Sequence, residues 1–216
     1  MTSKLILSLT LIMGLITTTL NAQKPEPGGD PELAKKIARF APTTLTADVS
    51  KLSAKDRQAL DKIIEAAKLL DPLFLRQVWS GNNELEKKLK ADKTPAGRQR
   101  LHYFYINDGP WSRLDANAPF IEGVPHEKPP QASYYPDDMT KDEFNSWVAT
   151  LSDADKQKAT GFFHLIRRGT DGKLTTVPYS QAYKEYLEPA ARLLREAAAL
   201  TTNVTLKNFL NKRADA

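Results

Sequence analysis

Cysteine is absent from the 216-residue sequence, and histidine occurs only at His102, His126 and His164. Without cysteine the chain has no disulfide bond, no thiol nucleophile and no cysteine-ligated metal site. The histidines lack the i, i+4 spacing that places two metal ligands on one face of a helix. His126 and Glu127 begin like a zinc-binding helix motif, but the two prolines that soon follow are incompatible with a helix. The sequence therefore predicts no metal ligand in this chain.

Other catalytic signatures are missing as well. No Gly-x-Ser-x-Gly motif occurs, and Ser180 is placed to cap a helix instead. The run GTDGK lacks the spacing of a phosphate-binding loop, and the adjacent Asp137 and Asp138 are typical of a helix start. The net charge of +5 is interspersed along the chain without a basic stripe, which argues against a nucleic-acid partner. We predict no catalytic residue here.

Residues 1–22 have the pattern of a cleavable signal peptide, with Lys4 ahead of an apolar run and small residues before Gln23. A membrane anchor is the alternative, but the apolar run is shorter than the roughly 20 residues that a bilayer span needs. The sequence thus predicts an exported protein, periplasmic or secreted, with no membrane attachment after cleavage. We expect residues 23–52 to form a Pro/Gly-rich tether and an irregular segment with one short helix over Pro31–Phe40, and residues 53–216 to form the folded part.

Helical patterns dominate the first half of the folded part. Ser53 and Asp56 have capping-box spacing, which predicts a helix over about 53–71. A second helix starts near Asp71 and Pro72, and a short charged helix follows Gly81. The aromatic-rich residues 100–107 favour a strand, which would contain His102. The predicted buried face of the first helix consists of Leu60, Ile63, Ile64, Ala67 and Leu70.

The second half mixes a long loop, helices and a hairpin. Residues 108–138 hold six of the fourteen prolines, so this unusually long connection is functional or wraps around something. Thr140 and Ser152 each begin a short helix, and residues 161–180 predict a β-hairpin. A long helix over 180–200 and a short terminal helix complete a fold that is mainly α with a small antiparallel β-hairpin, an α+β class.

The stretch Tyr103–Pro125 combines aromatic side chains, an Asn-Asp-Gly-Pro turn and several charges. Trp111 can form an apolar wall and Arg113 can hold a substrate carboxylate. The alternative is structural: Arg113 pairs with Asp115 or with carbonyls of the loop, and Trp111 and Phe120 fill the core. The candidate substrate-binding residues are Asn107, Asp108, Trp111, Arg113 and Asp115.

Several long runs together resemble one known family: LLDPLFLRQVWSGN, YFYINDGPWSRLDANAPFIEGVP, YYPDDMTKDEFNSW, GFFHLIRRGTDGKLTTVPYSQAY and LEPAARLLREAAALTTNVTLKNFLNKRADA. They are similar to the N-terminal part of exported bacterial zinc hydrolases related to dipeptidyl peptidase III. The similarity covers roughly Leu52 to Ala216. It implies a two-lobed metallopeptidase that releases dipeptides from peptide N-termini, with the substrate in the cleft between the lobes.

The resemblance also implies a zinc ion, held by a His-Glu-x-x-His or His-Glu-x-x-x-His helix and a downstream Glu. This sequence contains neither motif. We therefore expect a partial lobe, incomplete at its C-terminus, that is inactive alone, binds no zinc itself and meets peptide only with the missing or complementary lobe. Loops of the lobe without zinc face the cleft in such enzymes, which strengthens the substrate-wall interpretation of Asn107 to Asp115.

Two other functions stay open on the sequence. A free-standing helical module of the cell envelope, derived from the same family, would bind peptides or partners without chemistry. An enzyme that uses carboxylates alone, such as a glycosidase, would need an acid and a partner carboxylate at a defined separation.

Overall fold

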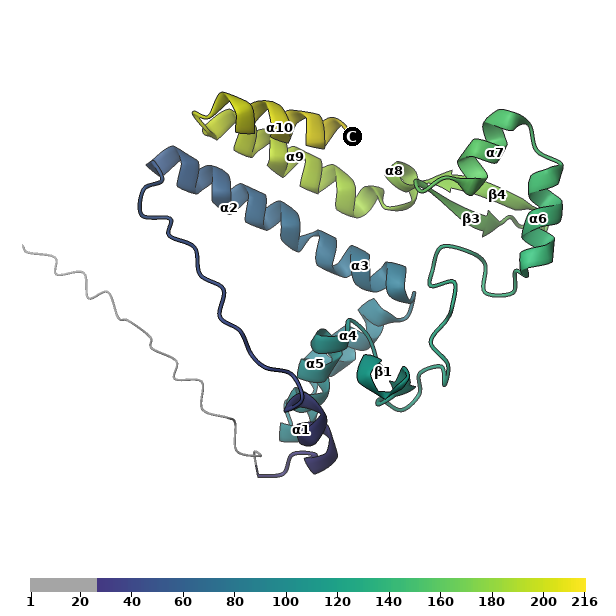
Figure 1. Ribbon diagram of the computed structural model, residues 1–216, viewed down its shortest axis with the longest axis horizontal. Helices are drawn as coiled ribbons and strands as arrows, with labels where there is room; N and C mark the ends of the chain where they lie inside the picture. The colour runs from purple at the N-terminus through teal and green to yellow at the C-terminus, as the bar shows by residue number, and fades with distance from the viewer. Residues whose placement is uncertain (1–26) are drawn as a thin grey trace, which may run out of the picture.

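A computed structural model describes residues 27–216, so the predicted signal peptide lies outside the described residues. Ten α-helices, one 3₁₀ turn and four short strands occur in this part of the chain (Figure 1). The helices and the 3₁₀ turn, η1, are α1 (Pro31–Ile37), α2 (Ala54–Lys68), α3 (Leu70–Val78), α4 (Asn82–Ala91), α5 (Pro95–Asn107), η1 (Arg113–Asp115), α6 (Lys141–Ala149), α7 (Asp153–Thr160), α8 (Tyr179–Ala182), α9 (Lys184–Leu200) and α10 (Val204–Asp215). The strands are β1 (Trp111–Ser112), β2 (Ala118–Pro119), β3 (His164–Arg168) and β4 (Leu174–Pro178). The predicted α+β class is confirmed.

Helices α2, α9 and α10 lie side by side in one layer (Figure 1). Small side chains fill the seam between them. Ala59 and Ala66 of α2 are buried against alanine and leucine side chains of α9, and Leu210 of α10 closes the same cluster. Alanine lets two helix backbones approach closely because its side chain ends at Cβ. The Ser53 hydroxyl accepts a hydrogen bond from the Asp56 amide at 3.1 Å, which confirms the predicted cap.

The predicted buried face of α2 is partly wrong. Ile63 does pack into the seam, but Ile64 is 42% exposed and Leu70 is 44% exposed, and Ala67 is exposed too. The buried stripe is instead centred on Ala59 and Ala66. The bulky residues gave the stronger hydrophobic signal, whereas the alanine-rich surface of α9 selects the side of α2 that has small residues.

Helices α3, α4 and α5 form a second core around Leu75, Leu89 and Phe104. The predicted strand over 100–107 is wrong, because these residues form the last two turns of α5. Thr94 caps this helix, and Pro95 occupies its first turn, where a missing N–H costs nothing. His102 is therefore an exposed helical residue and not part of a strand.

The predicted hairpin is confirmed, with β3 and β4 antiparallel and His164 opposite Pro178. Helices α6 and α7 cover it through a third core that includes Ile166 and Leu174. The hydroxyls of Thr140 and Ser152 cap α6 and α7, as predicted.

The predicted cap at Ser180 is wrong, because α8 begins at Tyr179, after Pro178, and has no side-chain cap. The predicted helix over 180–200 is also interrupted at Tyr183, which separates α8 from α9. Pro189 consequently lies in the second turn of α9.

The proline-rich loop 108–138 joins the helical layers to the hairpin (Figure 1). The Ser133 amide donates to the Gln77 carbonyl of α3 at 2.9 Å, and the Ile166 amide of β3 donates to the Tyr134 carbonyl at 3.0 Å. The half-buried Arg167 guanidinium donates to the Ser133 and Tyr134 carbonyls at 2.9 and 3.2 Å. The loop is thus held by backbone hydrogen bonds between α3 and β3.

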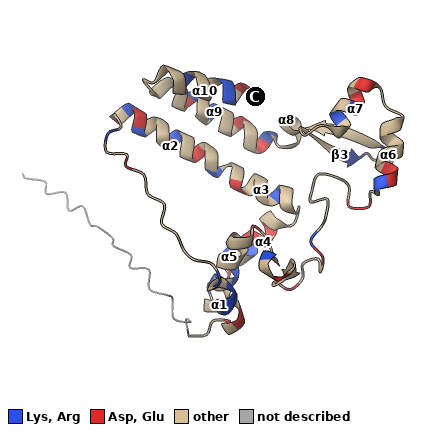
Figure 2. Ribbon diagram, in the orientation of Figure 1, with Lys and Arg blue, Asp and Glu red and all other residues tan. Residues whose placement is uncertain are grey.

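Charged side chains of both signs are interspersed along the helices (Figure 2). Among residues 27–216, no helix is both long and apolar enough to cross a bilayer.

The alanine seam is tested by a matched pair of substitutions. We expect Ala66→Glu to lower the free energy of unfolding by about 3 kcal/mol or more, because it buries a carboxylate among apolar side chains. Ala67→Glu, one position along the same helix but exposed, should change it by less than about 0.5 kcal/mol. Urea unfolding followed by circular dichroism measures the free energy of unfolding of both variants. Equal losses would contradict the burial of the Ala66 side of α2.

Candidate functional site

The predicted site residues lie at the end of α5 and in the turn that follows it. Helix α5 ends where Asp108 adopts a left-handed conformation with φ 52°. Gly109 follows with φ 155°, a value that side-chain-bearing residues rarely adopt. The chain then forms β1, the 3₁₀ turn and β2, whose two-residue ladder pairs Trp111 with Pro119. All five candidate residues are therefore within one compact turn.

Trp111 fills the core of this turn. Its side chain is only 2% exposed, and its ring lies edge-to-face against Trp79 with centroids 5.4 Å apart. The indole Nε1 donates a hydrogen bond to the Pro125 carbonyl at 3.0 Å. A buried tryptophan with a satisfied N–H stabilises the loop that carries the other candidates, and it presents no ring face to solvent in the described structure.

Asn107 is also buried and holds the turn by both ends of its amide. Its Nδ2 donates to the Tyr103 carbonyl at 2.9 Å, and its Oδ1 accepts from the Arg113 amide at 3.0 Å. These bonds satisfy its polar atoms, so its local role is to position the backbone of Arg113.

Asp108 and Arg113 are the two candidates whose charged ends reach solvent. The Arg113 Nη2 donates to the Asp108 carboxylate at 2.7 Å and to the Asn107 carbonyl at 3.0 Å. The two side chains are 40% and 53% exposed. They present an anion and a cation side by side, which is a suitable surface for a ligand that carries both an ammonium group and a carboxylate, such as a short peptide.

Asp115 connects the turn to α1. Its carboxylate accepts hydrogen bonds from Arg39 at 2.7 and 2.8 Å, from Lys36 at 2.9 Å and from the Ser112 hydroxyl at 2.6 Å. The Arg39 guanidinium, then the Ser112 hydroxyl and Lys36, lower the pKa of Asp115 far below its usual range. The Tyr103 hydroxyl completes the network by bonding Ser112 at 2.7 Å. Neither cation was identifiable from the sequence, because both lie more than seventy positions away.

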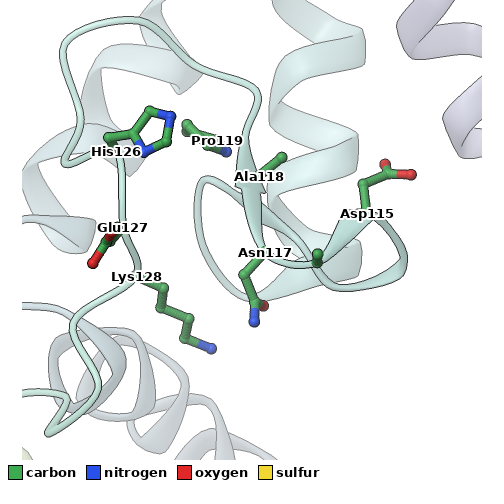
Figure 3. A pocket seen from close by; sticks show the side chains of 8 residues that line it. Asp115, Asn117, Ala118, Pro119, His126, Glu127 and Lys128 are labelled. Carbon is green, nitrogen blue, oxygen red and sulfur yellow. The ribbon is translucent and has the colours of Figure 1, made fainter.

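Two cavities border this turn. The first, of about 390 Å³, lies beside Asn117, His126 and Lys128 (Figure 3). In Figure 3 the carboxylates of Asp115 and Glu127 lie on opposite sides, so they do not converge on one point. Within residues 27–216, no group of three or more His, Cys, Asp or Glu side chains is placed to hold a metal ion.

The second cavity, of about 730 Å³, lies between α3, α4 and α5 and includes Asp108. Phe74 and Tyr105 provide apolar walls, while Glu86 and Lys90 form an ion pair at its rim at 2.9 Å. Burial, and then the hydrogen bond to Glu86, raise the pKa of the Tyr105 hydroxyl. Apolar walls with a few polar groups are typical of ligand sites, so we regard this larger cavity as the stronger candidate.

Comparison with known proteins gives a consistent relationship. No protein-family model matches the chain. The structure of dipeptidyl-peptidase III from Corallococcus sp. strain EGB is similar with a TM-score of 0.82 and 53% identity, covering 86% of this chain and 34% of that one. The enzyme from Caldithrix abyssi is similar with a TM-score of 0.78 and 42% identity, covering 84% and 34%. The relationship to dipeptidyl-peptidase III predicted from the sequence is confirmed at this level.

A curated protein from Arabidopsis thaliana named Nudix hydrolase 3 is 32% identical over 232 residues, covering 85% of this chain and 30% of that protein. The chain thus spans about a third of the length of each of these proteins. Their names describe whole polypeptides.

Stability measurements distinguish a core role from a surface role for Trp111 and Arg113. We expect Trp111→Ala to lower the free energy of unfolding by about 3–5 kcal/mol, because it empties a fully packed position. Arg113→Ala should shift the melting temperature by less than about 2 °C, since its guanidinium is half exposed. Thermal unfolding checks both, and a tolerated Trp111→Ala would contradict the core role of the indole.

The Asp115 network generates a second prediction. Asp115→Asn should speed hydrogen exchange of the α1 amides at pH 7, because it removes the charge that holds Lys36 and Arg39. Asp61→Asn, on the exposed surface of α2, is the matched control and should leave α1 unchanged.

The Asp115 contact also predicts a pH dependence. Because the folded-state pKa of Asp115 is lowered, its stabilisation is present above the usual value of about 4 and is lost as the pH falls through the folded-state value. Unaltered hydrogen exchange of the α1 amides in Asp115→Asn would contradict the role of Asp115 in holding α1.

Proposed function

We propose that this chain is one part of an exported, zinc-dependent peptidase of the dipeptidyl-peptidase III kind, which releases dipeptides from the N-termini of peptides. The single observation that carries the proposal is the shared sequence and fold with the Corallococcus enzyme over most of this chain. Identity at this level over so long a segment supports a shared architecture, and the function of the whole protein is the extension that we propose.

The proposed division of labour follows from which side chains are present. The described residues do not fit a zinc site, because they assemble no three-ligand group. In this proposal, the zinc ion and its ligands belong to the part of a dipeptidyl-peptidase III-like protein that this chain does not match. In this proposal, the side chains of residues 27–216 take no catalytic step.

We assign this chain a part in holding the substrate. Asp108 lines the larger cavity and Arg113 is ion-paired with it, so this pair offers opposite charges to a peptide with an ammonium group, a carboxylate and backbone amides. A charge-assisted hydrogen bond from the Arg113 guanidinium fixes a carboxylate in position. The buried Asn107 and Trp111 and the ion-paired Asp115 keep the turn rigid, which reduces the entropy lost on binding.

A chimeric enzyme tests this proposal. Residues 27–216 replace the matching segment of the Corallococcus dipeptidyl-peptidase III, and release of dipeptides from a peptide substrate is measured. We expect activity that a chelator abolishes. A chimera that folds cooperatively but releases no dipeptide would overturn the proposal.

The same chimera tests the substrate role of the turn. Arg113→Ala should lower kcat/KM by about tenfold, the loss expected for one charge-assisted hydrogen bond. The control is Arg192→Ala, on the exposed face of α9, which removes an equal charge and should leave kcat/KM unchanged. Equal kcat/KM values for both variants would exclude Arg113 from substrate binding.

A further inference from the structure

Residues 41–49, with the sequence APTTLTADV, form an extended segment between α1 and α2 that we call the strap (Figure 1). Every residue of the strap is exposed, and Leu45 is 91% exposed. No hydrogen bond joins residues 41–47 to any other part of the described chain. Within the described chain, residues 41–47 of the strap therefore have a row of unpaired backbone N–H and C=O groups.

The strap has the sequence pattern of a strand. Leu45, Ala47 and Val49 alternate with polar residues, and this period of two places them on one face of an extended chain. Thr and Val favour strands over helices. The pattern predicts a strand with one apolar face, yet the described residues provide no partner strand for it.

Both ends of the strap are fixed. On its N-terminal side, Arg39 is bound to Asp115, and the Phe40 ring packs edge-on against Tyr103 at 6.2 Å. On its C-terminal side, the Arg57 guanidinium donates a hydrogen bond to the Ser50 carbonyl at 3.0 Å. An extended segment anchored at both ends loses less entropy when it pairs than a free one.

We propose that the strap adds as an edge strand to a β-sheet in the further polypeptide of a dipeptidyl-peptidase III-like protein, and that Leu45 and Val49 are buried there. The inference rests on the proposed function. It is supported by the length of the matched structures, because this chain covers only 34% of each of them. The unmatched two thirds of those structures supply additional surface.

A second copy of the chain is a poorer partner. Two straps alone would form a two-stranded ribbon with an exposed apolar face, and such a ribbon is marginally stable in water. A sheet that already has several strands buries that face and also satisfies the strap backbone.

Hydrogen exchange tests the pairing. In the isolated chain, the strap amides should exchange at the rate of an unstructured peptide. In the chimera with the Corallococcus enzyme, amides on one edge of the strap should exchange at least about 100-fold more slowly. Free exchange of these amides in an active chimera overturns the strap pairing and leaves the proposed function intact. Protected amides in an inactive chimera support the pairing and overturn the function.

A matched pair of variants tests the buried face. Leu45→Asp should leave the melting temperature of the isolated chain unchanged, because Leu45 packs against nothing there, but lower that of the chimera by about 4 °C or more. Val204→Asp, at an exposed position on α10, is the control. It should lower the melting temperature of the chimera by no more than it lowers that of the isolated chain.

A third measurement covers a chimera that fails to fold. The chain is co-expressed with the part of the Corallococcus enzyme that lies outside the match. Copurification of the unaltered chain and of Val204→Asp, but not of Leu45→Asp, supports the proposal. Copurification of Leu45→Asp as efficiently as the unaltered chain overturns it, as does failure of the unaltered chain to copurify.

Discussion

The close packing of α2 against α9 is the constraint on which the rest of the chain depends. Alanines meet on both sides of this seam, and the Thr201 hydroxyl donates to the Asp56 carboxylate at 2.8 Å across 145 residues of sequence. The Ser53 hydroxyl, and then Thr201, lower the pKa of this carboxyl group. Closing so long a loop costs entropy that increases only slowly with length, so a well-packed seam suffices to close it. The chain from α3 to α8 is then one long connection between two helices, α2 and α9, that pack against each other.

Specific hydrogen bonds hold this connection in place. Loop 108–138 runs between α3 and β3 with its carbonyls bound by Arg167, and the turn around Trp111 is joined to α1 by Asp115. The result is a rigid turn in which Asp108 lines the larger cavity and Arg113 is ion-paired with Asp108. A substrate-facing surface needs this kind of support, because loops are precise only where the scaffold over-determines them.

Local chemistry was predictable from the sequence where it acts over a few residues. The caps at Ser53, Thr140 and Ser152 and the hairpin turn depend on neighbours three or four positions away, and all were predicted. Residues 100–107 misled because aromatic residues favour strands in isolation, while Thr94 and Pro95 start a helix that continues through them. The buried side of α2 and the partners of Asp115 depend on residues distant in sequence, which no local pattern specifies. The sequence left two roles open for Trp111, and its contact with the distant Trp79 places it in the core.

Native-state hydrogen exchange in increasing urea tests the central claim most directly. If the seam is the base of the fold, slowly exchanging amides of α2 and α9 open together, with one common free energy and one common dependence on urea. Loss of protection in α2 at a clearly lower urea concentration than in α9 would mean that the two helices are stable independently. That result would contradict the seam as the interaction that holds the chain together.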